Sequence, residues 1–154
     1  MIYKLSYLAL QVTRTPYQTP YIISQIESQR GFGLKIYIAG PYSADSAKCK
    51  QENVTKAIDA GLAVWKKGHS PYIPHLTHFV DYRAKITNTH MTWEDYIEWD
   101  KSWLEVCDGL LYLGSSKGAE IELELARKMG KRIFFNVNSV PIAAKCRDSI
   151  AVGH

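Results

Sequence analysis

The sequence predicts an α/β fold: a small doubly wound, flavodoxin-like parallel sheet of four to five strands with helices on both faces. One pattern in the sequence predicts this class. Short apolar runs that end at turn residues alternate with longer segments of helical periodicity along residues 35–137. Strands that alternate with helices build βαβ units, and such units form a parallel sheet that is covered on both sides.

Each element follows from a local pattern. The apolar run KIYIAG is closed by Gly40 and Pro41, and Thr92 opens a helix with Asp95 three residues later, in a capping-box arrangement. The expected strands are 35–40, 70–73, 109–114 and 131–137, and the expected helices are 46–67, 92–107 and 118–129. A loop rich in His and Thr is expected after the second strand, and the tail 138–154 stays unassigned.

The composition divides the chain and excludes several classes of protein. Residues 1–34 form an N-terminal extension of uncertain structure, and residues 35–154 form one domain. The formal charge of +4 suits an anionic small molecule but is too small and scattered for nucleic-acid binding. No window is apolar enough to span a membrane.

Cysteine use and the N-terminus predict a cytoplasmic protein. The three cysteines are widely spaced and form no CxxC pair, which fits a reducing compartment. The first apolar run is interrupted by Lys4 and Ser6, and no small-residue cleavage site follows, so we do not expect a signal peptide.

Two acids occupy positions where a helix should be apolar. Glu122 shares its helical stripe with Leu125, Ala126 and Met129, whereas Glu120 lies about 200° away on a solvated face. Glu122 either serves chemistry at the ligand-binding edge of the sheet or complements the helix dipole as a first-turn acid.

Asp100 is the second such acid. It fills a gap in the apolar stripe of the helix at 92–107, between Ile97 and Leu104. An acid in a core stripe is costly unless it is paired or used, so Asp100 is either hydrogen-bonded locally or functional. Enzymes that act at a glycosidic carbon commonly use two carboxyl groups in unlike environments, one as the nucleophile and one as the acid.

Three segments, taken in order, resemble the nucleoside 2-deoxyribosyltransferase superfamily, which includes the deoxynucleoside 5′-monophosphate N-glycosidases. They are KIYIAGPYS at 35–43, the D-x7-D pair of Asp100 and Asp108, and SKGAEIELELARKMGKRI at 116–133. The third segment is the strongest, because its Ser, Gly, Glu-Leu and Ala match the family at the same spacing. The resemblance covers residues 35–137 and implies that 35–154 is a catalytic domain of this type.

The resemblance implies an N-glycosidase that cleaves a nucleoside 5′-monophosphate through a covalent glycosyl-enzyme. Glu122 matches the nucleophile and Asp100 the acid that helps the base leave, while Tyr37 matches a tyrosine beside the nucleophile or is a core residue. The expected substrate-binding residues are Gly40, Tyr42, Ser43, His75, Ser116 and Gly118. No cofactor or metal is implied, and family members are homo-oligomers, so we expect a dimer or a larger assembly.

Two positions leave the substrate open. Ser116 matches the serine of the nucleotide hydrolases, where it donates to phosphate, although it also suits an ordinary helix N-cap. The arginine that those hydrolases carry after the first strand is missing from Gly40-Pro41-Tyr42-Ser43. A 2-deoxyribosyltransferase, and a nucleotide-binding sensor without turnover, therefore remain as alternatives.

The His-rich and aromatic segments have several interpretations. His75 lies in the loop expected to line the base pocket, or it is a structural imidazole, and no ligand set supports a metal site. Lys117 either adds a phosphate contact or is a plain surface lysine, and we do not count it among the site residues. A cluster of aromatic residues on the helix at 92–107 is expected to be mostly core or subunit interface, namely Trp93, Tyr96, Trp99 and Trp103.

Overall fold

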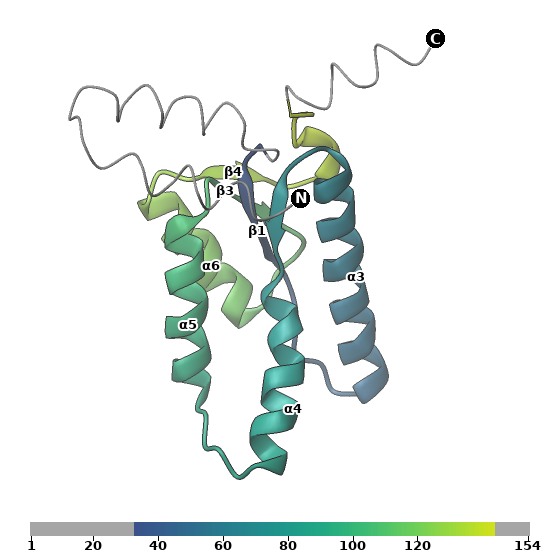
Figure 1. Ribbon diagram of the computed structural model, residues 1–154, viewed down its shortest axis with the longest axis vertical. Helices are drawn as coiled ribbons and strands as arrows, with labels where there is room; N and C mark the ends of the chain where they lie inside the picture. The colour runs from purple at the N-terminus through teal and green to yellow at the C-terminus, as the bar shows by residue number, and fades with distance from the viewer. Residues whose placement is uncertain (1–32, 144–154) are drawn as a thin grey trace, which may run out of the picture. The chain divides into compact units, whose positions relative to one another are not determined.

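A computed structural model describes residues 33–143 of the chain, and the extension predicted at 1–34 lies almost wholly outside this range. Within it, four parallel strands form one sheet in the order β2-β1-β3-β4 (Figure 1). The elements are β1 Lys35–Ala39, α3 Ala47–Lys66, β2 Ser70–Tyr72, η1 Pro74–Thr77, α4 His78–Ile86, α5 Trp93–Val106, β3 Gly109–Tyr112, α6 Lys117–Lys128, β4 Arg132–Phe134 and η2 Val137–Ser139. The predicted flavodoxin-like class is confirmed.

Helices cover both faces of the sheet because successive strand residues point to opposite sides. Ile36 and Ile38 pack on one face against Ala57, Ala60 and Val64 of α3. Tyr37 and Ala39 point to the other face, where buried residues of α5 and α6 meet them, namely Leu104, Leu123 and Ala126. The two apolar layers leave β1 buried from both sides, as the uninterrupted run KIYIA predicted.

Side-chain caps begin the three long helices where the sequence predicted them. Thr92 and Asp95 form the full capping box of α5, since each side chain accepts a hydrogen bond from the backbone of the other. Ser46 and Ser116 cap α3 and α6, each accepting from the backbone N–H three residues later. The cap of α6 fixes where the segment that carries Glu122 begins.

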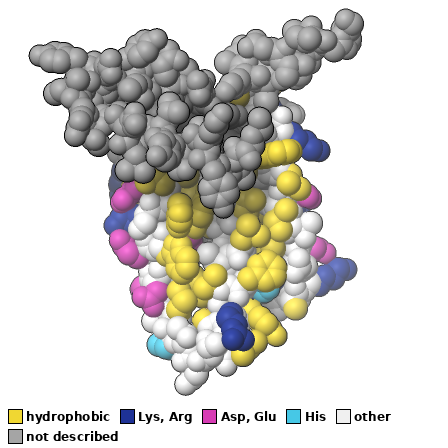
Figure 2. Space-filling model, in the orientation of Figure 1, with side chains coloured by type: hydrophobic (Ala, Val, Ile, Leu, Met, Phe, Trp, Pro, Cys, Tyr) yellow, Lys and Arg dark blue, Asp and Glu magenta, His cyan; other side chains and the backbone are white. Residues whose placement is uncertain are grey.

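The loop predicted after β2 is wrong, because η1 and α4 occupy most of this segment. The apolar side chains of α4 do not form a buried stripe: Phe79, Tyr82 and Ile86 are exposed, and Ala84 is the buried residue of this helix. Figure 2 shows hydrophobic side chains at the surface on the face where α4 and α5 lie. Periodicity detects a helix only when one face packs on a core, so this signal was missing. Asn88, with a φ of 52°, follows the end of the helix.

The strand order places a switch point between β1 and β3. The chain leaves β1 to form β2 on one side, and later returns to form β3 on the other. The loops that follow β1 and β3 therefore diverge above the carboxyl ends of the strands, which is where ligands bind in such sheets.

Within residues 33–143, none of the helices has both the length and the apolar character needed to cross a membrane.

Leu104→Ala should lower the free energy of unfolding by about 3 kcal/mol, because Leu104 is fully buried between α5 and the sheet and its loss leaves a cavity. Leu62→Ala is the matched control, since the Leu62 side chain is 52% exposed. Urea unfolding of both variants measures the difference. Equal losses would contradict the core assigned to this face.

Candidate active site

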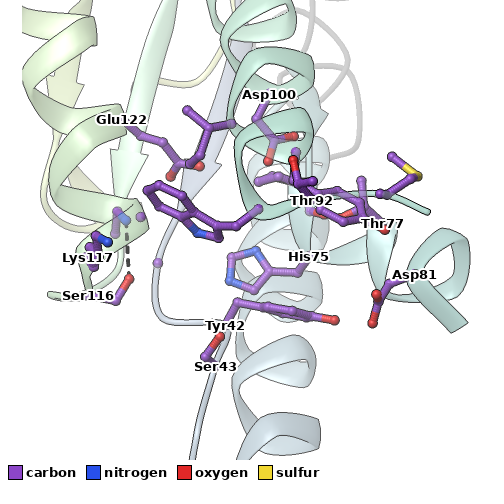
Figure 3. A pocket seen from close by; sticks show the side chains of 18 residues that line it. Tyr42, Ser43, His75, Thr77, Asp81, Thr92, Asp100, Ser116, Lys117 and Glu122 are labelled. Carbon is purple, nitrogen blue, oxygen red and sulfur yellow. Dashed lines mark hydrogen bonds between the residues drawn. The ribbon is translucent and has the colours of Figure 1, made fainter. Parts of the chain in front are cut away.

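A cavity of about 550 Å³ opens at the carboxyl edge of the sheet. Its walls come from the loop after β1, from η1 and α4, from the first half of α5 and from the start of α6 (Figure 3). Eight of the nine site residues expected from the sequence line it: Gly40, Tyr42, Ser43, His75, Asp100, Ser116, Gly118 and Glu122. The ninth, Tyr37, does not line the cavity but contacts Glu122, which does. The cavity therefore brings together residues from segments that are far apart in the sequence.

Glu122 is held by a hydrogen bond from the sheet. The hydroxyl of Tyr37 donates to Oε1 of Glu122 over 2.7 Å, and the Tyr37 side chain is completely buried in β1. This contact joins the central strand to the first turns of α6. It leaves Glu122 partly buried and lining the cavity, whereas Glu120 is exposed and accepts a hydrogen bond from Tyr112.

Asp100 is held in the same manner by a second tyrosine. The hydroxyl of Tyr72 donates to Oδ1 of Asp100 over 3.3 Å. Tyr72 is opposite Tyr37 in the parallel register of β2 and β1, and the two rings lie 5.4 Å apart. The other side of Tyr72 stacks on Trp103 of α5 at 5.0 Å. Two neighbouring phenols therefore each hold one carboxylate at the floor of the cavity.

The two carboxyl groups differ in pKa. Loss of hydration on burial raises the pKa of Glu122 to about 8, which the hydrogen bond from Tyr37 opposes and the charge of Asp100 reinforces. Burial raises the pKa of Asp100 to about 6, and the bond from Tyr72 opposes this shift. Between these values the pair carries one proton, and the higher pKa of Glu122 favours Glu122 over Asp100 as its site.

The start of α6 lies at one side of the cavity. The hydroxyl of Ser116 accepts from the N–H of Ala119 over 3.2 Å, so its own hydrogen stays available to a ligand. The N–H groups of Lys117 and Gly118 belong to the unpaired first turn of the helix. A Cβ on Gly118 would meet nothing within 4 Å, so the space beside it is open. This corner favours an anion.

Lys117 is exposed, as expected of a surface lysine, and it also lines the cavity. Its ammonium lies 4.4 Å from the centre of the Trp93 ring. Its position directly after the N-cap of α6 brings the ammonium close to the first turn of this helix.

The loop after β1 packs closely and carries Tyr42. A Cβ on Gly40 would lie 3.1 Å from the Cβ of Leu113, so glycine at this position serves the packing of the two strand ends as well as access to the cavity. The hydroxyl of Tyr42 and Nδ1 of His78 are hydrogen-bonded at 3.0 Å, which links the loop to α4. Ser43 lies beside Tyr42 at the rim.

The aromatic residues of α5 are not core. Trp93, Trp99 and Trp103 are each at least 40% exposed, so the core half of that expectation is wrong for the tryptophans, and a subunit interface stays a prediction. Trp93 and Tyr96 line the cavity together with Asp81 of α4. Asp81 was not among the expected site residues, because it lies on α4, a helix that the sequence pattern did not predict.

Among the residues that the structure describes, no three His, Cys, Asp or Glu side chains gather in a group that could hold a metal ion.

Comparison with protein families assigns the chain to one family. It belongs to a family described as a domain of unknown function, DUF7768, whose model matches residues 34–136. The matched segment contains every residue of the site described above. A comparison with curated proteins finds no match.

Glu122→Gln should make the protein more stable at alkaline pH than at acidic pH, relative to the native chain. A carboxyl whose pKa is raised by folding stabilises the folded state below its unfolded pKa and loses this contribution as pH rises through about 8. From pH 5 to pH 9, the free energy of unfolding of the variant should rise by about 2 kcal/mol relative to that of the native chain. The partial exposure of Glu122 keeps this difference below what the pKa shift alone would give. Thermal unfolding across this pH range measures it.

Glu124→Gln is the control for this substitution, because Glu124 is exposed on the same helix and its ion pairs are with the neighbouring Arg127 and Lys128. A stability difference that is the same at pH 5 and pH 9 for Glu122→Gln would contradict the burial assigned to the carboxyl group.

Proposed function

We propose that the chain is an N-glycosidase that cleaves the base–sugar bond of a nucleoside 5′-monophosphate through a covalent bond to Glu122. The observation that carries this proposal is the pair of carboxyl groups, one on α5 and one on α6, in one cavity and in unlike environments. Reactions at a glycosidic carbon need one carboxylate as nucleophile and one carboxylic acid as proton donor.

The reaction assigns a role to each group. An ionised Oε of Glu122 attacks C1′ as the bond from C1′ to the base nitrogen breaks, and the base nitrogen takes the electron pair and a proton from Asp100. Water, deprotonated by Asp100, then attacks C1′ of the glycosyl ester, and Glu122 leaves as the carboxylate. The products are the free base and a sugar 5′-phosphate.

The proposed attack requires Glu122 to be ionised and the shared proton of the pair to be on Asp100. The positive charge that develops at C1′ in the transition state stabilises an ionised Glu122, as does the hydrogen bond from Tyr37. Asp100, turned toward the departing base, then holds the proton where it is needed. The tyrosine pair keeps both carboxyl groups oriented throughout this exchange.

The corner at the start of α6 supports a phosphate on the substrate. It offers the Ser116 hydroxyl, two helix N–H groups and the Lys117 ammonium, and Lys117 supplies the cation that the missing arginine would have provided. Glu120 does not line the cavity, so its charge does not oppose an anion there. We also propose a cytosolic setting, where nucleoside monophosphates occur.

Glu122→Ala should abolish release of free base, with a loss of at least about 10³-fold, because it removes the oxygen that attacks C1′ in the proposed reaction. The measurement is chromatography of bases released from ribo- and deoxyribonucleosides and their 5′-monophosphates. Glu124→Ala, on the exposed face of the same helix, should keep native activity.

Other outcomes of this panel decide among the alternatives. Sugar transfer that needs a second base in the mixture would identify a 2-deoxyribosyltransferase. Nucleotide binding that survives Glu122→Ala, without base release by the native chain, would identify a sensor and contradict the proposed reaction.

The rate of base release should follow a bell-shaped pH profile with limbs near the two raised pKa values. Below about 6 both carboxyl groups are protonated and the nucleophile is lost, whereas above about 8 both are ionised and no proton is available for the leaving base. Initial rates from pH 4.5 to 9.5 measure the profile. A rate that keeps rising above pH 9 would remove Asp100 from the role of acid.

A further inference from the structure

The cavity extends beyond the two catalytic carboxyl groups toward α4. Figure 3 shows Glu122 and Ser116 at one side, Asp81 at the other, and His75 between them. Once a phosphate lies near Ser116 and C1′ lies near Glu122, the base must extend toward Asp81. The chemistry of this end therefore bears on which base the proposed enzyme accepts.

Asp81 offers a hydrogen-bond acceptor to this space. Its Oδ2 accepts from the ammonium of Lys85 over 2.9 Å, and the Lys85 side chain is 72% exposed whereas that of Asp81 is 26% exposed. The lysine therefore approaches from solvent, and Oδ1 has no partner among the described residues. A carboxylate with one free oxygen in a cavity wall accepts N–H groups and repels carbonyl oxygens.

His75 presents a second acceptor. Its Nε2 lies 3.0 Å from the carbonyl oxygen of Pro41, which can only accept, so Nε2 carries the hydrogen. Burial lowers the pKa of His75, which keeps the ring neutral and leaves a lone pair on Nδ1. That Nδ1 atom is buried and has no hydrogen-bond partner.

Tyr96 adds a third group with unused hydrogen-bonding capacity. Its hydroxyl is buried without a partner, and it is one of only two such side-chain groups in the described part of the chain. Both line this one cavity. Buried polar groups are normally paired, so two unpaired groups in one cavity indicate that a polar ligand completes them.

We propose that this end of the cavity selects a base that carries an exocyclic amino group, with Asp81 accepting its N–H hydrogens. Guanine offers an amino group beside a ring N–H, and cytosine offers an amino group beside a ring acceptor. Uracil and hypoxanthine place a carbonyl oxygen, or no group at all, where the amino hydrogens would lie. This inference rests on the proposed function for the orientation of the ligand.

The test compares matched pairs of nucleotides that differ at the amino position. Equilibrium dialysis on Glu122→Gln, which holds ligand without turnover, measures binding of guanosine against inosine and cytidine against uridine 5′-monophosphates, in the ribo and deoxy series. The amino member of each pair should bind about tenfold more tightly, because its analogue leaves the Asp81 carboxylate unpaired. Adding Asp81→Asn should reduce this ratio to below about threefold, since an amide donates as well as accepts.

Lys85→Gln is the matched control. It breaks the same ion pair but leaves the carboxylate, so it should keep the preference for amino bases. Equal affinities within each nucleotide pair would overturn the inference. So would an affinity ratio that Asp81→Asn leaves unchanged, or one that Lys85→Gln reduces as much as Asp81→Asn does.

The two proposals fail separately. Base release by the native chain without an amino preference would overturn the selectivity alone. An amino preference in binding, with no base released, would overturn the glycosidase alone. Absence of binding by all of these nucleotides would overturn both.

Discussion

The hydrogen bond between Tyr37 and Glu122 is the contact on which the site depends. It joins Tyr37, a fully buried residue of the central strand β1, to the Glu122 carboxyl group on α6, the helix that packs on this face of the sheet. A partly buried carboxyl group without a partner would cost several kcal/mol or turn toward solvent. The phenol makes burial of Glu122 tolerable, and burial in turn raises the pKa of Glu122 above that of Asp100. The hydrogen bond from Tyr37 therefore influences both the position of the Glu122 carboxyl group and, through its burial, the pKa of that group.

The parallel register extends this arrangement to the second acid. Tyr37 and Tyr72 are partners across β1 and β2, so their side chains leave the sheet on the same face. α5 and α6 pack on that face and bring Asp100 and Glu122 down onto the two phenols. A shift of β2 by one residue would turn Tyr72 to the α3 side and leave Asp100 unsupported.

The sequence predicted what depends on local order and missed what depends on contact across the fold. Apolar runs located the strands, and Thr92 and Ser116 located two helix starts, because these signals act within a few residues. Glu122 and Asp100 stood out as acids in apolar stripes, but the stripe cannot show that a tyrosine from another strand holds each one. Asp81 was missed with its helix, since α4 buries almost no apolar surface.

Charge along the cavity constrains how a ligand enters. One end combines the α6 N-terminus with the Lys117 ammonium, and the other holds the carboxylate of Asp81. A molecule with an anion at one end and N–H donors at the other satisfies both ends in one orientation only. In the reverse orientation its anion would face Asp81, and like charges in a partly buried site repel strongly. Under the proposed function, that orientation would place the bond between sugar and base against Glu122 and Asp100, so the polarity of the cavity and the position of the acids are consistent with one mode of binding.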